Sequence, residues 1–199
     1  MALTVNRKLN LVVPVYDDKN NVAYYVHSTP IASEIYDVYY RVISEVFSEI
    51  ISHGNVYSIS SGPKVAKMLL RDRAVATGRW AGANGVESGL FGEIRRLTNV
   101  VIPDAKGGWT TMGFEDAMNG DLMDKDDLEE VENLLCFFIV LSAMQRKKDP
   151  VIQSTLEAVS NLLDAQLTSS NSTEFVASLR ISTATENTGA KPTPSPIPV

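Results

Sequence analysis

The feature that most constrains this chain is an apolar run from Leu134 to Met144 that directly follows a dense acidic segment. The run has about half of the roughly 20 apolar residues that a membrane-spanning helix requires, so it predicts a buried core helix. Asp126 and Glu129 predict an N-terminal capping pair for this helix. Apolar residues at spacings of three and four continue it to the basic segment 146–148, whose charges suit a helix C-terminus.

Further helices are predicted on both sides of this run. Thr29-Pro30 supplies a cap and a first-turn proline for a long amphipathic helix, which glycine ends near His53-Gly54. A shorter helix follows Ser61-Gly62-Pro63, and a modest one spans residues 90–97. Asp149-Pro150 restarts the chain as another helix with almost no loop, which predicts a hairpin or a sharp elbow between two helices.

The segment 8–26 alternates apolar and polar residues on both sides of a polar, turn-rich break at 17–21. This pattern predicts a β-hairpin. A lone hairpin is marginal in water, so its apolar face is expected to pack on helices or to extend a sheet across a subunit boundary, which makes self-association an option. A further short strand is expected at Val100–Pro103, before a turn.

Beyond Gln166 the chain is rich in Ser, Thr and Asn, and it ends in alternating prolines. That composition predicts a disordered tail. The predicted fold is therefore mainly α with an N-terminal β-hairpin, in a single helical domain with a disordered C-terminal tail. The expected boundaries are a hairpin segment at 1–28, a helical domain at 29–165 that forms one unit with the hairpin, and the tail at 166–199.

The charge balance points toward protein partners. The net charge of −6 and the pI near 5.0 argue against general nucleic-acid binding, which draws on clustered Lys and Arg. The 44% hydrophobic and 21% charged residues are typical of a globular protein. No continuous apolar stretch follows the charges of residues 1–8, so a secretory signal is not expected. We expect a cytoplasmic protein with no membrane contact.

Residues that could carry chemistry do not form a recognisable set. Two histidines, His27 and His53, and the single Cys136 within an apolar run make no zinc pattern. The acidic cluster 121–132 lacks the order of a calcium loop and is better explained by a helix N-terminus, with cation binding as the open alternative. The glycine-rich stretch 78–92 lacks a phosphate-loop ending. We therefore expect no enzyme activity, no catalytic residues, no metal and no cofactor.

Candidate protein-binding residues follow from the amphipathic helices, because an apolar groove between helices is a common way to bind a helical partner. The candidates on the helices are Ile35, Tyr39, Val42, Phe47, Leu135 and Phe138. Trp80 and Trp109 are added as exposed anchors for a partner, and burial in the core is an equally good interpretation of both. The basic residues Lys64, Lys67, Arg71, Arg73 and Arg79 indicate a solvated helix face or, alternatively, a charge-complementary contact between copies.

Two segments carry a resemblance to a known family. The run from Glu129 to Phe138 and the segment from Leu167 to Arg180, followed by Ser182-Thr183-Ala184-Thr185 and Thr188-Gly189, resemble the tail assembly chaperones of long-tailed bacteriophages, the lambda-like group of siphophages. The similarity is organisational over most of the chain and closer over about the last sixty residues.

The resemblance implies a non-enzymatic role in the host cell cytoplasm, outside the mature virion. Such proteins coat the tape measure protein, keep it soluble and help the tail tube polymerise around it. A frameshifted longer form often recruits the tail tube protein. The alternative is a structural virion component, such as a tail completion or minor tail protein, whose hairpin joins a ring or tube sheet.

Overall fold

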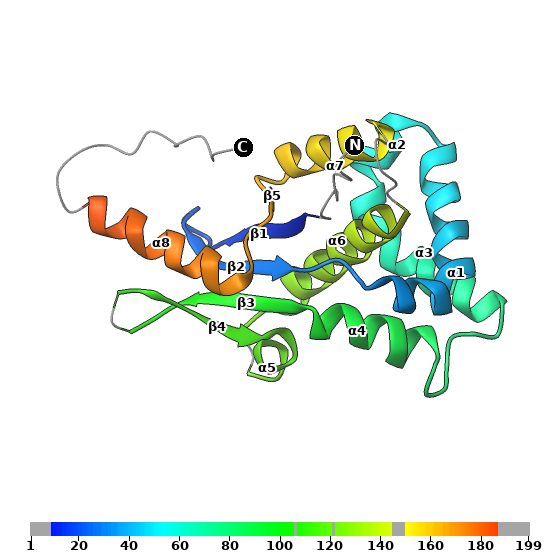
Figure 1. Cartoon of the computed structure of the whole chain (residues 1–199), viewed down its shortest axis with the longest axis horizontal. Coiled ribbons are helices and arrows are strands. Elements are labelled where there is room, and N and C mark those ends of the chain that lie inside the picture. The colour runs from blue at the N-terminus through cyan, green and yellow to red at the C-terminus, as the bar shows by residue number, and fades with distance from the viewer. Residues whose placement is uncertain (1–8, 106, 121, 145–149, 187–199) are drawn as a thin grey trace, which may run out of the picture.

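The computed structural model describes residues 9–105, 107–120, 122–144 and 150–186. Within these residues, five strands form one antiparallel sheet in the order β4-β3-β2-β1-β5 (Figure 1). The strands are β1 (Asn10–Tyr16), β2 (Val22–Ser28), β3 (Thr98–Pro103), β4 (Trp109–Gly113) and β5 (Gln166–Thr168). The prediction of a mainly α fold with one hairpin is therefore wrong, because the chain is mixed α/β.

The predicted hairpin is present as β1 and β2, and its turn is held by Asp17. The Asp17 Oδ1 accepts hydrogen bonds from the backbone N–H groups of Lys19 and Asn21, at 2.9 and 2.8 Å. Asn20 adopts φ 61°, a left-handed conformation that asparagine tolerates. The hairpin occupies the middle of the sheet, since β2 pairs with β3 and β1 pairs with β5. Strands of the same chain thus supply both of its neighbours.

Five of the described helices match the predicted ones, although α1 begins at Ser33 and not at Pro30. They are α1 (Ser33–Ser52), α3 (Gly62–Ala76), α4 (Phe91–Arg96), α6 (Lys125–Met144) and α7 (Pro150–Leu162). The structure adds α2 (Asn55–Ser60), the short π-helix η1 (Val86–Leu90), α5 (Phe114–Asn119) and α8 (Ser172–Glu186). The basic segment 146–148 and the expected cap Asp149 lie outside the described residues. In Figure 1, α1, α2 and α3 gather at one end of the molecule and α8 lies at the other.

One face of the sheet, here called the inner face, carries the buried side chains of Leu11, Val13, Tyr24, Val26 and Val100. They belong to the same apolar cluster as α1, α3 and α6. Helix α6 is buried at every position from 131 to 142, as expected for a helix inside the core. Burial on all sides explains why the second half of α6 has no polar face.

Helix α3 approaches α6 closely at Gly62. A Cβ at this glycine would lie 2.6 Å from the Phe137 ring, a separation that real side chains do not adopt. The absence of a side chain therefore sets how near the two helices can lie, and the Phe137 ring fills the contact with no exposed surface.

The opposite face, here called the outer face, carries Val12, Tyr25, His27 and Val101, and α8 packs on it. The Phe175 ring of α8 lies 5.3 Å from the Tyr25 ring and 6.3 Å from the His27 ring. His27 Nε2 also lies 2.9 Å from the Ser170 carbonyl oxygen, a hydrogen bond that the ring donates. The segment before α8 is thereby attached to β2.

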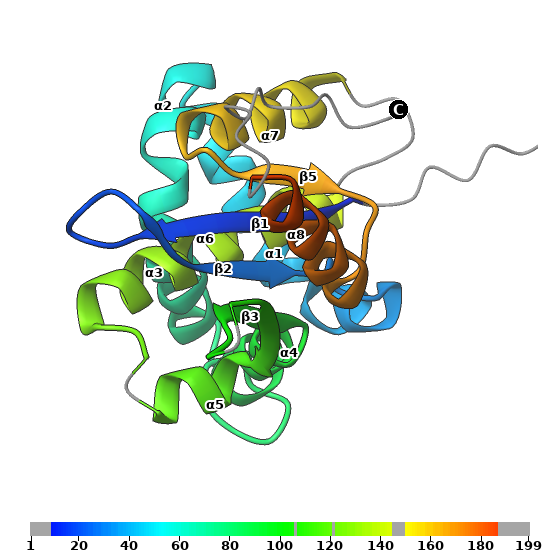
Figure 2. The ribbon, with the colours of Figure 1, turned by 90° about the vertical axis from the view of Figure 1, so that its left-hand side faces the viewer.

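The prediction of a disordered tail from 166 onward is wrong for residues 166–186. Strand β5 pairs with β1 beside the hairpin (Figure 2), and α8 begins with a reciprocal cap. The Asn171 side chain accepts a hydrogen bond from the Glu174 N–H, and the Glu174 carboxylate accepts one from the Asn171 N–H, both at 2.9 Å. Residues 187–199, the rest of the predicted tail, lie outside the described residues.

Candidate protein-binding site

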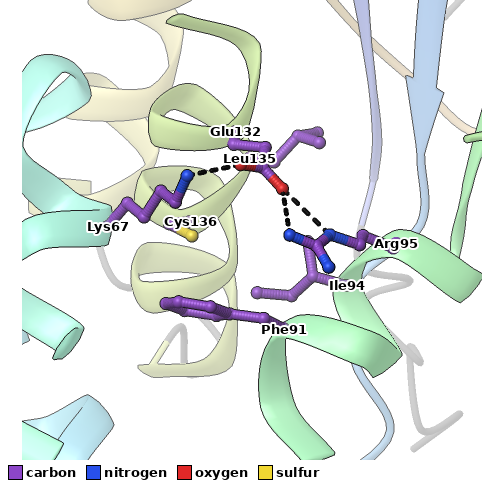
Figure 3. Close-up of a pocket in the computed structure, with 7 residues that line it drawn as sticks. All are labelled: Lys67, Phe91, Ile94, Arg95, Glu132, Leu135 and Cys136. Carbon is purple, nitrogen blue, oxygen red and sulfur yellow. Dashed lines mark hydrogen bonds and ion pairs between the residues drawn. The ribbon is translucent and has the colours of Figure 1, made fainter. Parts of the chain in front are cut away.

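A buried ion cluster joins three helices around Glu132 of α6 (Figure 3). Arg95 of α4 donates from Nε and Nη2 to the Glu132 Oε1, at 2.9 and 2.7 Å, and the Lys67 ammonium of α3 donates to Oε2. Only 8% of Glu132 is exposed, whereas about a third of each cationic side chain reaches solvent. Both carboxylate oxygens are thus occupied by charged donors.

The cavity beside this cluster is too small for a substrate. Its volume is about 10 Å³, the space of roughly one water molecule, and its walls include Phe91, Leu135 and Cys136. Burial, and then the Glu132 carboxylate, raise the pKa of the Cys136 thiol, which disfavours the nucleophilic thiolate. We interpret the cluster as a clamp that fixes α3, α4 and α6 relative to one another.

The acidic cluster lies at the N-terminus of α6. Asp124 caps the helix, because its Oδ1 accepts hydrogen bonds from the N–H groups of Asp126 and Asp127 at 2.9 and 2.8 Å. Asp126, the predicted cap, is therefore not the capping residue; its backbone N–H donates a hydrogen bond to the Asp124 carboxylate. The Tyr24 hydroxyl donates to Asp127 at 3.4 Å. Burial, followed by the charge of Asp124, raises the pKa of Asp127. Among the described residues no group of three potential ligands could hold a metal ion.

The predicted binding residues on the helices contribute mainly to the core. Four of them, Tyr39, Val42, Leu135 and Phe138, are at most 7% exposed and present almost no surface to a partner. Ile35 and Phe47 are half-buried and pack against the same core. Helical periodicity identified the helix faces that are buried in the core. It did not separate them from a face that could bind another protein.

The two tryptophans differ in their surroundings. Trp80 is half-buried between the Phe91 ring, at 5.7 Å, and the Arg71 guanidinium, 5.6 Å above the indole ring. These contacts secure the loop before η1. Trp109 of β4 is also half-buried, and its ring lies 5.2 Å from that of Tyr25 on the outer face. Of the two, Trp109 belongs to the face on which α8 packs.

The outer face also carries a groove that the sequence analysis did not predict. Its volume is about 110 Å³, and it is lined by Val12, Pro14, Tyr16, Val22, Tyr25, Asp164 and Gln166. Tyr16, at one side of this groove, is 41% exposed. A second row of apolar residues on β1, alternating with Leu11 and Val13, was the signal that could have revealed this surface.

Neither a protein-family model, nor a curated protein sequence, nor a solved structure matches this chain. Within its described part, no helix combines the length and hydropathy needed to cross a bilayer. The comparisons therefore assign neither a family nor a function to this chain.

Proposed function

We propose that this chain is a tail assembly chaperone of a long-tailed bacteriophage, which binds the tape measure protein in the host cytoplasm, keeps it soluble and promotes tail tube polymerisation around it. In this role it is not an enzyme, uses no cofactor and is not retained in the mature virion. The proposal originates in the family resemblance of the segments 129–138 and 167–180. In the fold, the first segment forms part of α6, and the second forms most of β5 and the first part of α8.

The observation that supports the proposal best is the apolar groove on the outer face. Residues of two strands line it, among them the half-buried Pro14 and Val22 and the exposed Tyr16, and the acidic Asp164 lies beside them. An accessible apolar groove with a charged rim suits the binding of another protein's helix.

Co-expression tests this function directly. The tape measure protein, expressed with this chain, should remain in the supernatant after lysis, and the two should co-purify. Expression of the tape measure protein alone, and with an unrelated acidic protein of similar size, provides the controls. Equal precipitation in all three cultures would rule out the proposed function. Recruitment of the tail tube protein by a longer, frameshifted form can be tested by the same co-purification.

The alternative, a structural virion component, relied on a hairpin that joins a neighbouring sheet. In this fold the hairpin has β3 and β5 as neighbours, so it is not the edge of the sheet, although β1 after Val12 has no strand on its β5 side. Mass spectrometry of purified virions separates the two functions. We expect this chain to be absent or far below stoichiometric levels, whereas a stoichiometric amount would support the structural component.

A further inference from the structure

The outer face is wide enough for two helices, and the described part of the chain supplies one. Five strands about 4.8 Å apart make a sheet roughly 20 Å wide, while packed helices lie about 10 Å apart. Helix α8 contacts β3 and β4 and reaches Tyr25 and His27 of β2. The groove lies on the other side of Tyr25, over β1 and β2 and beside the start of β5. The groove therefore lies next to the part of the sheet that α8 contacts.

The shape of the groove follows from the short length of β5, which begins opposite Val12. This strand pairs with Asn10, Leu11 and Val12, so the remainder of β1 has no strand on that side. Pro14 lies in this remainder, and proline has no backbone N–H to give to a further strand. A strand is thus a poor occupant here. A helix, which satisfies its own backbone groups, needs only apolar contact.

The chemistry of the groove selects for a particular kind of helix. The floor is apolar, with Val12, Pro14 and Val22, and two tyrosines flank it. Asp164 is the charged residue that lines the groove, so its rim carries a negative charge. A complementary partner carries an apolar stripe bordered by Lys or Arg.

We propose that this groove is the client site: it binds an amphipathic helix of the tape measure protein, with an apolar stripe and a basic border, alongside α8 on the outer face. The inference rests on the proposed function and adds the site and the chemical class of the bound helix. Tyr16 and Val22 contact the apolar stripe, and Asp164 contacts the basic border.

The first test compares lysine substitutions on two surfaces in the co-expression assay. Tyr16→Lys and Val22→Lys place a charge in the groove, and each should lower the co-purified tape measure protein about tenfold, as expected for loss of a central contact. Met68→Lys and Val75→Lys make the same charge change on α3, where the native side chains are 53% and 55% exposed. These controls should bind as the unchanged chain does, and circular dichroism confirms that all four variants are folded.

The outcomes separate the site from the function. If the unchanged chain does not retain the tape measure protein, the proposed function fails and the client site fails with it. If the unchanged chain retains it and the folded groove variants retain it equally, the function stands and the groove is not the client site. Loss of binding only in the α3 variants would instead place the client on α1–α3, and a change in the chain's own oligomeric state in the groove variants would identify a second copy as the occupant.

A labelling experiment tests the site without relying on loss of binding. Cys136 is buried, so a cysteine introduced at an exposed position becomes the reactive thiol of the folded chain. In the purified complex, Tyr16→Cys should react with a maleimide at least about fivefold more slowly than in the free chain, because the bound helix covers it. Met68→Cys should react at the same rate in both. Equal rates at Tyr16→Cys in the complex and the free chain would overturn the assignment.

Asp164→Asn isolates the electrostatic part of the interaction. Asp164 has φ 50°, a conformation that asparagine also adopts readily, so the substitution removes the charge with little strain. Co-purification should fall severalfold at low salt and approach that of the unchanged chain at high salt, where the rim charge is screened. No difference at low salt would exclude a basic border on the bound helix.

Discussion

The two faces of the sheet differ in how they are buried. The inner face belongs to one continuous apolar cluster with α1, α3 and α6, and side chains such as Val26 and Val100 have no exposed surface. The outer face is covered by α8 on the β3–β4 side and carries the groove on the β1 side. The comparison separates surface that maintains the fold from surface that is available to a partner. Substitutions on the two sides should therefore differ in how much they lower the free energy of unfolding and in how far through the structure their effect spreads.

The largest effect is expected on the inner side, for Phe137→Ala. The ring is fully buried between α6 and α3, so its removal leaves a cavity and should lower the free energy of unfolding by about 3–5 kcal/mol. Urea denaturation followed by circular dichroism measures the change. Leu162→Ala, at a position 61% exposed, is the control and should change stability by less than about 0.5 kcal/mol. A similar small change for Phe137→Ala would contradict the proposed core.

A smaller effect is expected for Glu132→Gln, which removes the charge shared by Lys67 and Arg95. Because about a third of each cationic side chain reaches water, the loss should be about 1–2 kcal/mol, below the cost of a fully buried broken pair. Glu130→Gln makes the same change at an exposed position of α6 and serves as the control. Equal stability of the two variants in urea would show that the ion cluster does not act as a clamp.

On the outer side, Phe175→Ala should act locally. The half-buried ring holds α8 against Tyr25 and His27, so its loss should weaken that contact by about 1–2 kcal/mol. Hydrogen exchange should then speed up roughly tenfold in α8 and stay unchanged in α6. Thr173→Ala, an exposed change on the same helix, is the control. Faster exchange in both helices would mean that the two sides of the sheet unfold as one unit.

The smallest effect is expected for Asp127→Asn, beneath Tyr24. The folded-state pKa of Asp127 is raised, so its contribution to stability is greatest below the unfolded-state pKa and is lost as the pH rises through the folded-state value. The asparagine variant should therefore equal or slightly exceed the native chain at neutral pH, by less than about 0.5 kcal/mol, and the difference should vanish in acid. Thermal unfolding between pH 3 and 7 checks this, and lower stability of the variant at neutral pH would contradict it.

The sequence predicted the inner side better than the outer side, for physical reasons. Period-two alternation in 8–26 and helical spacing in 128–141 indicate buried apolar residues, and most of those residues belong to the cluster beneath the inner face. Strand β4 was missed because Thr110 and Thr111 are exposed and leave no apolar alternation. Strand β3, in contrast, was predicted from its Val-Val-Ile run, and α3 was predicted to follow Ser61-Gly62-Pro63.

Helix α8 was missed because its Ser and Thr content was interpreted as low complexity. The Asn171–Glu174 pair, followed by Phe175, Val176 and Leu179, was the usable signal, since a capping box before apolar residues at helical spacing predicts a helix start. The groove was not predictable in the same way. Its walls come from β1, β2 and residues 164–166, which meet only after the sheet has formed.

The pairing of β5 with β1 also affects how the chain folds while it is being synthesised. These neighbouring strands are separated in sequence by nearly all of the helical part. At a synthesis rate of roughly 5–20 residues per second, about 8–30 s pass between translation of β1 and translation of β5. During that interval the nascent hairpin lacks a neighbour on one side. Nascent chains stalled before residue 166 should therefore aggregate more readily than chains stalled after α8.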